Sequence, residues 1–250
     1  PGAIVNNVWR RGERVWDTNS FFQGSFVKEV NDQFKTQVNA KYAFYRTHYV
    51  NNDDKLIEVD NLYKQREVYV STANMYTIFP FWDVSMSYDF QWNEMKADMY
   101  GFVFPTRFTN LLSIATALRL GKVKLQGSGL ATFVNDRVKE GPAPKARQIL
   151  TPAVFLSYKP FDKHDFSLRA FYKKTFRMPT FNDLYYADMG NSKLDPEYVT
   201  QYNLGTVYQK QWGNKLFRHF KIQADGYYNY VKDKIIAYPK GQQFRWTMLN

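Results

Sequence analysis

The stretch that decides the fold is residues 81–92, which reads FWDVSMSYDFQW. Every second residue is bulky and apolar, and the residues between them are mostly small, polar or acidic. The apolar set is Trp82, Val84, Met86, Tyr88, Phe90 and Trp92. A period of two is the side-chain period of a β-strand, so this segment is predicted to be a strand with one wholly apolar face.

Similar alternation covers much of the chain. We predict strands near 20–30, 34–49, 66–78, 81–92, 108–120, 122–137, 149–159, 165–177, 198–210, 217–232 and 243–250, with another in 3–9. Residues 111–118 are the best helical alternative, although a strand fits them equally well. Many of these strands exceed about ten residues, whereas strands of soluble proteins most often have about five or six.

The predicted connections alternate in length. Short links at 31–33, 79–80, 121, 160–164 and 211–214 alternate with longer polar links near 50–65, 93–107, 138–148, 178–197 and 233–242. Outer-membrane barrels combine short periplasmic turns with longer extracellular loops in the same way. The predicted fold class is therefore all-β, a transmembrane antiparallel up-and-down β-barrel, and the alternation predicts about 11–12 strands in this chain.

Composition agrees with a barrel. The 250 residues are 18% aromatic, yet the mean hydropathy is −0.53. Such a content of bulky rings excludes a disordered chain, and a barrel with an apolar outer face, a polar lumen and polar loops accounts for both values. The absence of cysteine excludes a disulfide scaffold and a zinc–thiolate site. No window approaches the ~20 apolar residues of a transmembrane helix.

Other function classes find little support in the residues. The net charge is +11, but Lys and Arg are scattered and no nucleic-acid-binding motif occurs, so we expect no nucleic-acid partner. Motifs of serine hydrolases and zinc proteases are also missing, so we expect no enzyme, no cofactor and no metal site. His48, His164 and His219 are isolated from one another. His48 is expected to be a solvated rim histidine, with contact to haem or a metal as the alternative.

One region resembles a known family. It runs from Phe176 to Glu197 and is followed by Tyr202–Gly205 and then Tyr227–Ile236. It is similar to the barrel of TonB-dependent outer-membrane receptors, which show F-R-x-P-x-x-x-x-L-Y, then G-N-x-x-L-x-P-E, then Y-x-L-G. The matching positions are Phe176, Arg177, Pro179, Leu184, Tyr185, Gly190, Asn191, Leu194, Pro196 and Glu197.

The residues themselves favour a structural role for this motif. Arg169 and Arg177 lie on the polar parity of their strand and can face the lumen, because an Arg at mid-depth on the lipid side costs ~2–4 kcal/mol. Pro179 removes a ladder donor and ends the strand, and Gly190 with Asn191 supplies a turn. We interpret the motif as a loop anchor at the extracellular rim, with ligand contact as the alternative.

The resemblance implies a barrel of about 22 strands closed by a plug. Residues 1–250 would be part of one such barrel domain, with the plug domain and the TonB box absent. It further implies a receptor of the bacterial outer membrane that takes up a scarce, bulky nutrient of the siderophore–iron, haem or cobalamin type. The implied partners are the TonB complex acting through the plug, the nutrient, lipid with lipopolysaccharide, and a surface lipoprotein. Two alternatives stay open: a complete small outer-membrane barrel acting as a passive channel or enzyme, and a soluble all-β binding module.

Overall fold

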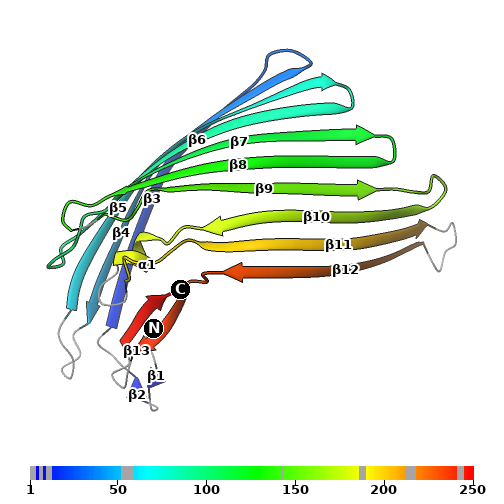
Figure 1. Ribbon diagram of the computed structural model, residues 1–250. Helices are drawn as coiled ribbons and strands as arrows, with labels where there is room; N and C mark the ends of the chain where they lie inside the picture. Colours follow the sequence, from blue (N-terminus) through cyan, green and yellow to red (C-terminus); the bar gives the residue numbers. More distant parts are fainter. Residues whose placement is uncertain are drawn as a thin grey trace.

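The computed structural model describes residues 4–5, 8–9, 13–51, 59–141, 143–185, 190–211, 218–240 and 245–250. Its main element is a ten-stranded antiparallel sheet in which every strand pairs with its sequence neighbours. The strands are β3 (Glu13–Glu29), β4 (Phe34–Asn51), β5 (Val59–Phe79), β6 (Trp82–Ala97), β7 (Thr106–Leu120), β8 (Val123–Arg137), β9 (Arg147–Tyr158), β10 (Asp165–Arg177), β11 (Glu197–Gln211) and β12 (His219–Lys232). Figure 1 shows them as one twisted, curved wall. The predicted up-and-down order is confirmed, and the described strands leave the wall open at β3 and β12.

The smaller elements differ from the sequence predictions. Segment 3–9 contains a hairpin of two short strands, β1 (Ile4–Val5) and β2 (Val8–Trp9), instead of a single strand. The predicted link 233–242 contains β13 (Ile236–Lys240), which pairs with β14 (Arg245–Leu249). The link 178–197 contains a short helix, α1 (Phe181–Tyr185). Residues 111–118 lie inside β7, so the helical alternative for them is wrong.

Within the described ranges, no helix has the length and apolar character needed to cross a membrane.

The sheet has two chemically different faces. Directly opposed residues of antiparallel strands lie on the same face. The register therefore extends the apolar face and the polar face of β6 across the whole wall. The outer face carries Trp82, Val84 and the other apolar residues of that set, together with exposed side chains such as Phe22 (79%) and Leu204 (66%) on other strands. An apolar surface of this breadth indicates contact with lipid or a partner rather than with water.

The inner face carries the polar residues of the alternating pattern, and their side chains form hydrogen bonds and ion pairs from strand to strand. Lys41 donates to Glu67, and Asn93 donates to the same carboxylate. Asn39 donates to Ser71 in a second cross-strand link. Since each of these groups finds a partner on a neighbouring strand, the inner face is a hydrogen-bonded polar lining and not a hydrophobic core.

The two ends of the wall also differ. At the end with short links, which we call the short-link end, Gly121 turns the chain between β7 and β8 with a φ of 57°. Aromatic pairs gather there, such as Phe79 with Phe81 at 5.4 Å and Tyr208 with Phe220 at 6.5 Å between ring centroids. At the opposite end, the long-link end, two clusters of buried apolar side chains form around α1. Packing of the kind found in soluble cores is therefore concentrated at the long-link end.

Candidate functional site

The link from β10 to β11 is fixed by a network that we call the loop anchor, residues 176–185 and 190–197. It begins with reciprocal capping of α1. The Thr180 amide donates to the Asp183 carboxylate at 2.9 Å, and the Asp183 amide donates to the Thr180 hydroxyl at 3.1 Å. Both bonds satisfy amides that the first turn of a helix leaves without partners. Pro179, which precedes the cap, is fully buried.

Arg177 connects the two strands that flank the link. Its Nη1 donates to Asp183 at 3.0 Å, and its Nε lies 3.9 Å from the carboxylate of Glu197, the residue directly opposite on β11. Glu197 also accepts a hydrogen bond from the Ile235 amide at 3.0 Å. Arg177 therefore ties α1 to the sheet, and Glu197 extends that tie to the chain beyond β12.

A second arginine, which the sequence analysis did not single out, holds the base of the loop anchor. Arg107 on β7 makes two hydrogen bonds of 2.6 Å to the carboxylate of Asp136, its cross-strand neighbour on β8. Its third donor reaches the Pro179 carbonyl at 2.6 Å, and its guanidinium lies 5.2 Å from the ring centroid of Phe181. The two charged side chains are only 11% and 3% exposed. This buried pair joins the barrel wall to the start of α1.

Apolar packing holds the other side of α1. Phe181 is buried with four residues from β5, β6 and the link after β6, namely Tyr63, Met95, Ala97 and Phe102. Leu184 is buried with Leu194 and with Ile235, which precedes β13. Tyr185 packs against both clusters. The helix therefore bridges the wall and the β13–β14 hairpin.

Tyr185 brings an uncompensated polar group into this packing. Its hydroxyl is buried and finds no hydrogen-bond partner among the described residues. Burial, with a smaller effect of the Asp136 carboxylate, raises the pKa of Tyr185 to about 12. A phenol in this setting stays neutral throughout the physiological range.

The second half of the motif closes the link. A Cβ on Gly190 would lie 2.7 Å from backbone atoms of Leu184 and Tyr185, so only glycine fits. The backbone amide of Asn191 donates to the Asp183 carbonyl at 2.9 Å, and its side-chain amide donates to the Met248 carbonyl on β14 at 2.9 Å. Pro196 is fully buried. The motif residues described so far therefore meet at one place, while Phe176 lies on β10 opposite Tyr198.

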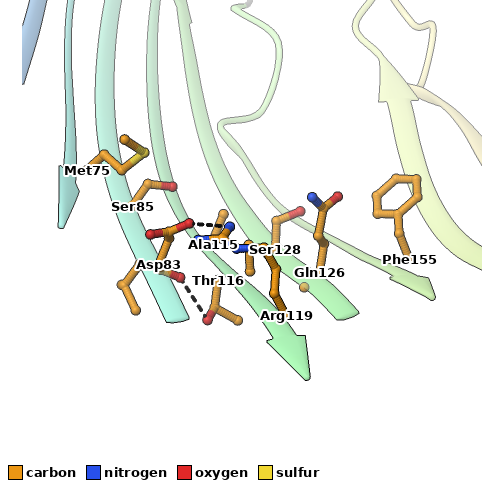
Figure 2. A pocket seen from close by; sticks show the side chains of 12 residues that line it. Met75, Asp83, Ser85, Ala115, Thr116, Arg119, Gln126, Ser128 and Phe155 are labelled. Carbon is orange, nitrogen blue, oxygen red and sulfur yellow. Dashed lines mark hydrogen bonds and ion pairs between the residues drawn. The ribbon is translucent and has the colours of Figure 1, made fainter. Parts of the chain in front are cut away.

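The inner face is hollowed at several places between the long-link end and the short-link end. Directly below the loop anchor, a hollow of about 420 Å³ is lined by Gln65, Glu67, Gln91, Asn93, Arg107 and Thr109 among others. Figure 2 shows another hollow, of about 350 Å³, near the short-link end. There Arg119 donates to Asp83 at 2.6 Å, and Thr77 donates to the other oxygen of that carboxylate at 2.8 Å. Each hollow offers amides, hydroxyls and paired charges to whatever fills the lumen.

Metal-binding side chains do not gather in the described part of the chain. No group of three or more His, Asp or Glu side chains there could hold a metal ion. His48 lies on the outer face, where its Nε2 is 2.6 Å from the carboxylate of Asp60. Its side chain is about 30% exposed, in agreement with a partly solvated position near the strand end.

The fold and its lining define the class: a membrane β-barrel wall with long links anchored at one end. A family model described as "TonB dependent receptor-like, beta-barrel" matches residues 3–250, and the chain belongs to this family. Proteins of this family are located in the bacterial outer membrane. A search of curated proteins gave no significant match.

Solved structures show the same fold. The copper transporter OprC aligns with a TM-score of 0.73 at 15% identity, over 96% of this chain and 42% of its own. The apoprotein form of the FrpB iron transporter from Neisseria meningitidis (F5-1 variant) aligns at 0.69 and 11% identity, over 100% and 42%. The Serratia marcescens hemophore receptor HasR, solved with its hemophore HasA and heme, aligns at 0.55 and 12% identity, over 97% and 48%. This chain spans less than half the length of each.

Proposed function

We propose that this chain forms part of the barrel of a receptor that imports a scarce, bulky nutrient across the outer membrane with energy supplied through TonB. The observation that carries the proposal is the hydrogen-bonded polar inner face, since it gives a broad barrel a lumen suited to a polar cargo and to a polar plug. The neighbouring structures are a copper transporter, an iron transporter and a hemophore receptor in complex with its hemophore and heme. These neighbours support a metal-containing cargo for this chain.

The loop anchor has a structural role in this proposal. The ten motif residues hold the long link after β10 at the extracellular rim. The side chains of Arg177, Asn191 and Glu197 are used in contacts with α1, with each other across the strands, and with the chain of the β13–β14 region. A ligand would then contact the inner-face hollows and the tips of the links. In the same proposal residues 1–250 belong to one barrel domain, TonB acts through a plug, and transport requires no catalytic step by this wall.

Uptake assays test the transport proposal. The complete receptor is expressed in an outer-membrane host that lacks its own iron and haem receptors, with and without functional TonB. Accumulation of ferric citrate, a ferric catecholate, haem and a copper complex is followed with radioactive metal. We expect at least one of these to accumulate only when both the receptor and TonB are present. Accumulation that persists without TonB, or none above the empty-vector level, contradicts the proposal.

The orientation of the wall has an independent test, because the chain contains no cysteine. Ser192→Cys lies in the loop anchor, and Lys163→Cys lies in the short link between β9 and β10. In intact cells, a membrane-impermeant maleimide is expected to label the first variant and to leave the second unlabelled until the outer membrane is opened. The wild-type receptor measures the background. The reverse labelling pattern would show that the long-link end faces the periplasm.

A further inference from the structure

Three cations lie side by side on the outer face near the long-link end. Arg46 on β4 is directly opposite Lys64 on β5, and Lys64 is directly opposite Lys96 on β6. Opposed residues in an antiparallel pair have Cβ atoms about 4.5–5.5 Å apart, and like charges in such positions repel one another. We call these three residues the cationic row. A row of this kind costs stability unless an anion lies against it.

The adjacent row extends the positive charge. Arg66 lies opposite Glu94, Glu94 lies opposite Thr106, and Thr106 lies opposite Arg137. The cationic row together with Arg66 and Arg137 forms what we call the cationic patch. Glu94 is the carboxylate within it and lies 3.3 Å from Lys96. Among the described residues, no ion pair is found for Arg46, Lys64 or Arg66, so most of this charge has no protein counter-ion there.

The cationic patch directly adjoins the exposed apolar side chains of the outer face, which we call the apolar band. The next row toward the middle of the wall places Tyr42 opposite Val68 and Val68 opposite Trp92. Trp and Tyr typically mark the membrane–water interface of barrels. Lys64, Arg66, Lys96 and Arg137 are exposed, and Arg46 is half-buried. The patch therefore lies at the depth of lipid head groups, on the face whose next residues contact acyl chains.

We propose that the cationic patch binds the phosphates of lipid A, the membrane anchor of lipopolysaccharide, in the outer leaflet. This rests on the proposed function in one respect, namely that the long-link end faces the cell exterior. Continuity with the apolar band favours a lipid over an acidic protein. Whatever covers both surfaces must present acyl chains to the band and an anionic head group directly beyond it. Lys and Arg donate charge-assisted hydrogen bonds to phosphate oxygens, so such a head group supplies counter-ions to the patch.

The test compares two triple variants of the complete receptor. One removes the cationic row as Arg46→Gln, Lys64→Gln and Lys96→Gln. The matched control removes the same charge from separate places on the outer face as Lys28→Gln, Lys174→Gln and Lys232→Gln. Binding of bisphosphorylated lipid A, its dephosphorylated form and phosphatidylglycerol is measured by native mass spectrometry in detergent. Resistance of the folded barrel to SDS without heating shows that each variant is folded.

We expect the wild-type receptor and the control to bind bisphosphorylated lipid A more tightly than the other two lipids. One basic residue near an anionic lipid surface contributes about fivefold in affinity, so the row variant should lose on the order of 100-fold, and Lys64→Gln alone about fivefold. Equal affinities of the row variant and the control for bisphosphorylated lipid A overturn the proposal. Equal affinities of the wild-type receptor for the bisphosphorylated and the dephosphorylated lipid overturn it as well. Tighter binding of phosphatidylglycerol than of lipid A overturns the choice of lipid. Failure of TonB-dependent uptake in the wild type would contradict the transport proposal and leave these binding results unchanged.

Discussion

Arg107→Met is expected to loosen the loop anchor while the barrel wall stays intact. The substitution removes both hydrogen bonds to Asp136, the bond to the Pro179 carbonyl and the contact with the Phe181 ring. It leaves the Asp136 carboxylate, which is 3% exposed, without its cation. Breaking a buried ion pair by removing one partner costs about 3–5 kcal/mol. The cost should fall on local opening. The start of α1 packs over the charged pair through Pro179 and Phe181, so opening of α1 returns the Asp136 carboxylate to water, and the backbone ladder of β7 and β8 is not broken.

Hydrogen exchange of the complete receptor measures that opening. The reporting amides are Leu184, which donates to the Thr180 carbonyl at 3.1 Å, and Asn191, which donates to the Asp183 carbonyl at 2.9 Å. A local cost of about 3–5 kcal/mol corresponds to exchange that is roughly 150- to 5,000-fold faster at both amides. Amides in the middle of β7 and β8 should keep their wild-type rates.

Two further variants make this prediction refutable. Arg119→Met breaks the more exposed pair with Asp83 at the short-link end and should leave both reporting amides unchanged. Arg107→Met combined with Asp136→Leu removes both charges and should recover most of the lost protection, since an apolar pair carries no desolvation cost. Wild-type exchange at Leu184 and Asn191 in Arg107→Met would show that the arginine does not hold the loop anchor. Equally faster exchange throughout β7 and β8 would show that the effect is global.

The remaining predictions concern the same anchor. Gly190→Ala should lower the unfolding free energy by about 1–3 kcal/mol through overpacking, whereas Gly129→Ala, with nothing within 4 Å of the added Cβ, should be neutral in the same chemical denaturation. Tyr185→Phe should raise stability by about 1 kcal/mol at pH 7 by removing an unpartnered hydroxyl. Because the pKa of Tyr185 is raised from 10.0 to about 12, wild-type stability should fall as the pH rises above 10, and the Phe variant should lose less. Thr180→Ala should cost about 1 kcal/mol by removing the cap. Equal unfolding free energies of Gly190→Ala and Gly129→Ala would contradict the overpacking at Gly190. The same dependence of the unfolding free energy on pH in the wild type and in Tyr185→Phe would contradict the raised pKa of Tyr185.

The strands could be predicted from the sequence because alternation is a local property. Residues 165–177 were expected to be a strand, and β10 has those bounds. The prediction was less accurate where charges occupy the outer parity. β5 was expected from 66 and begins at Val59, since its hydrogen-bonded ladder continues past the apolar band through Asp60, Lys64 and Arg66. The apolar alternation predicts only the part of the strand that carries apolar side chains, whereas the backbone ladder sets where the strand begins. The part of β5 that was not predicted, residues 59–65, includes Lys64 of the cationic patch.

The loop anchor was only partly predictable. Its motif residues came from the resemblance to a family, and Pro179 was correctly expected to follow the end of β10. Helix α1 has five residues, too few for a helical period to appear in the sequence. Arg107 and Asp136 carry no local signal, because each sits on the polar parity of its own strand and only the β7–β8 register places them opposite each other. Their burial depends in turn on α1, which a local pattern does not place.

The distribution of burial explains why mutations should act so unevenly in this chain. Along most of the wall, outer side chains are exposed and inner side chains pair with one another, so a single substitution changes few packed contacts. At the long-link end, Arg107, Phe181 and Leu184 are held by close packing and by a buried ion pair, and a similar substitution there leaves a cavity or an unpaired charge. Under the proposed function the long links contact a ligand outside the membrane, and such a link must start from a fixed point. The loop anchor supplies one such point, which is why its variants are expected to alter the presentation of the links while the wall remains folded.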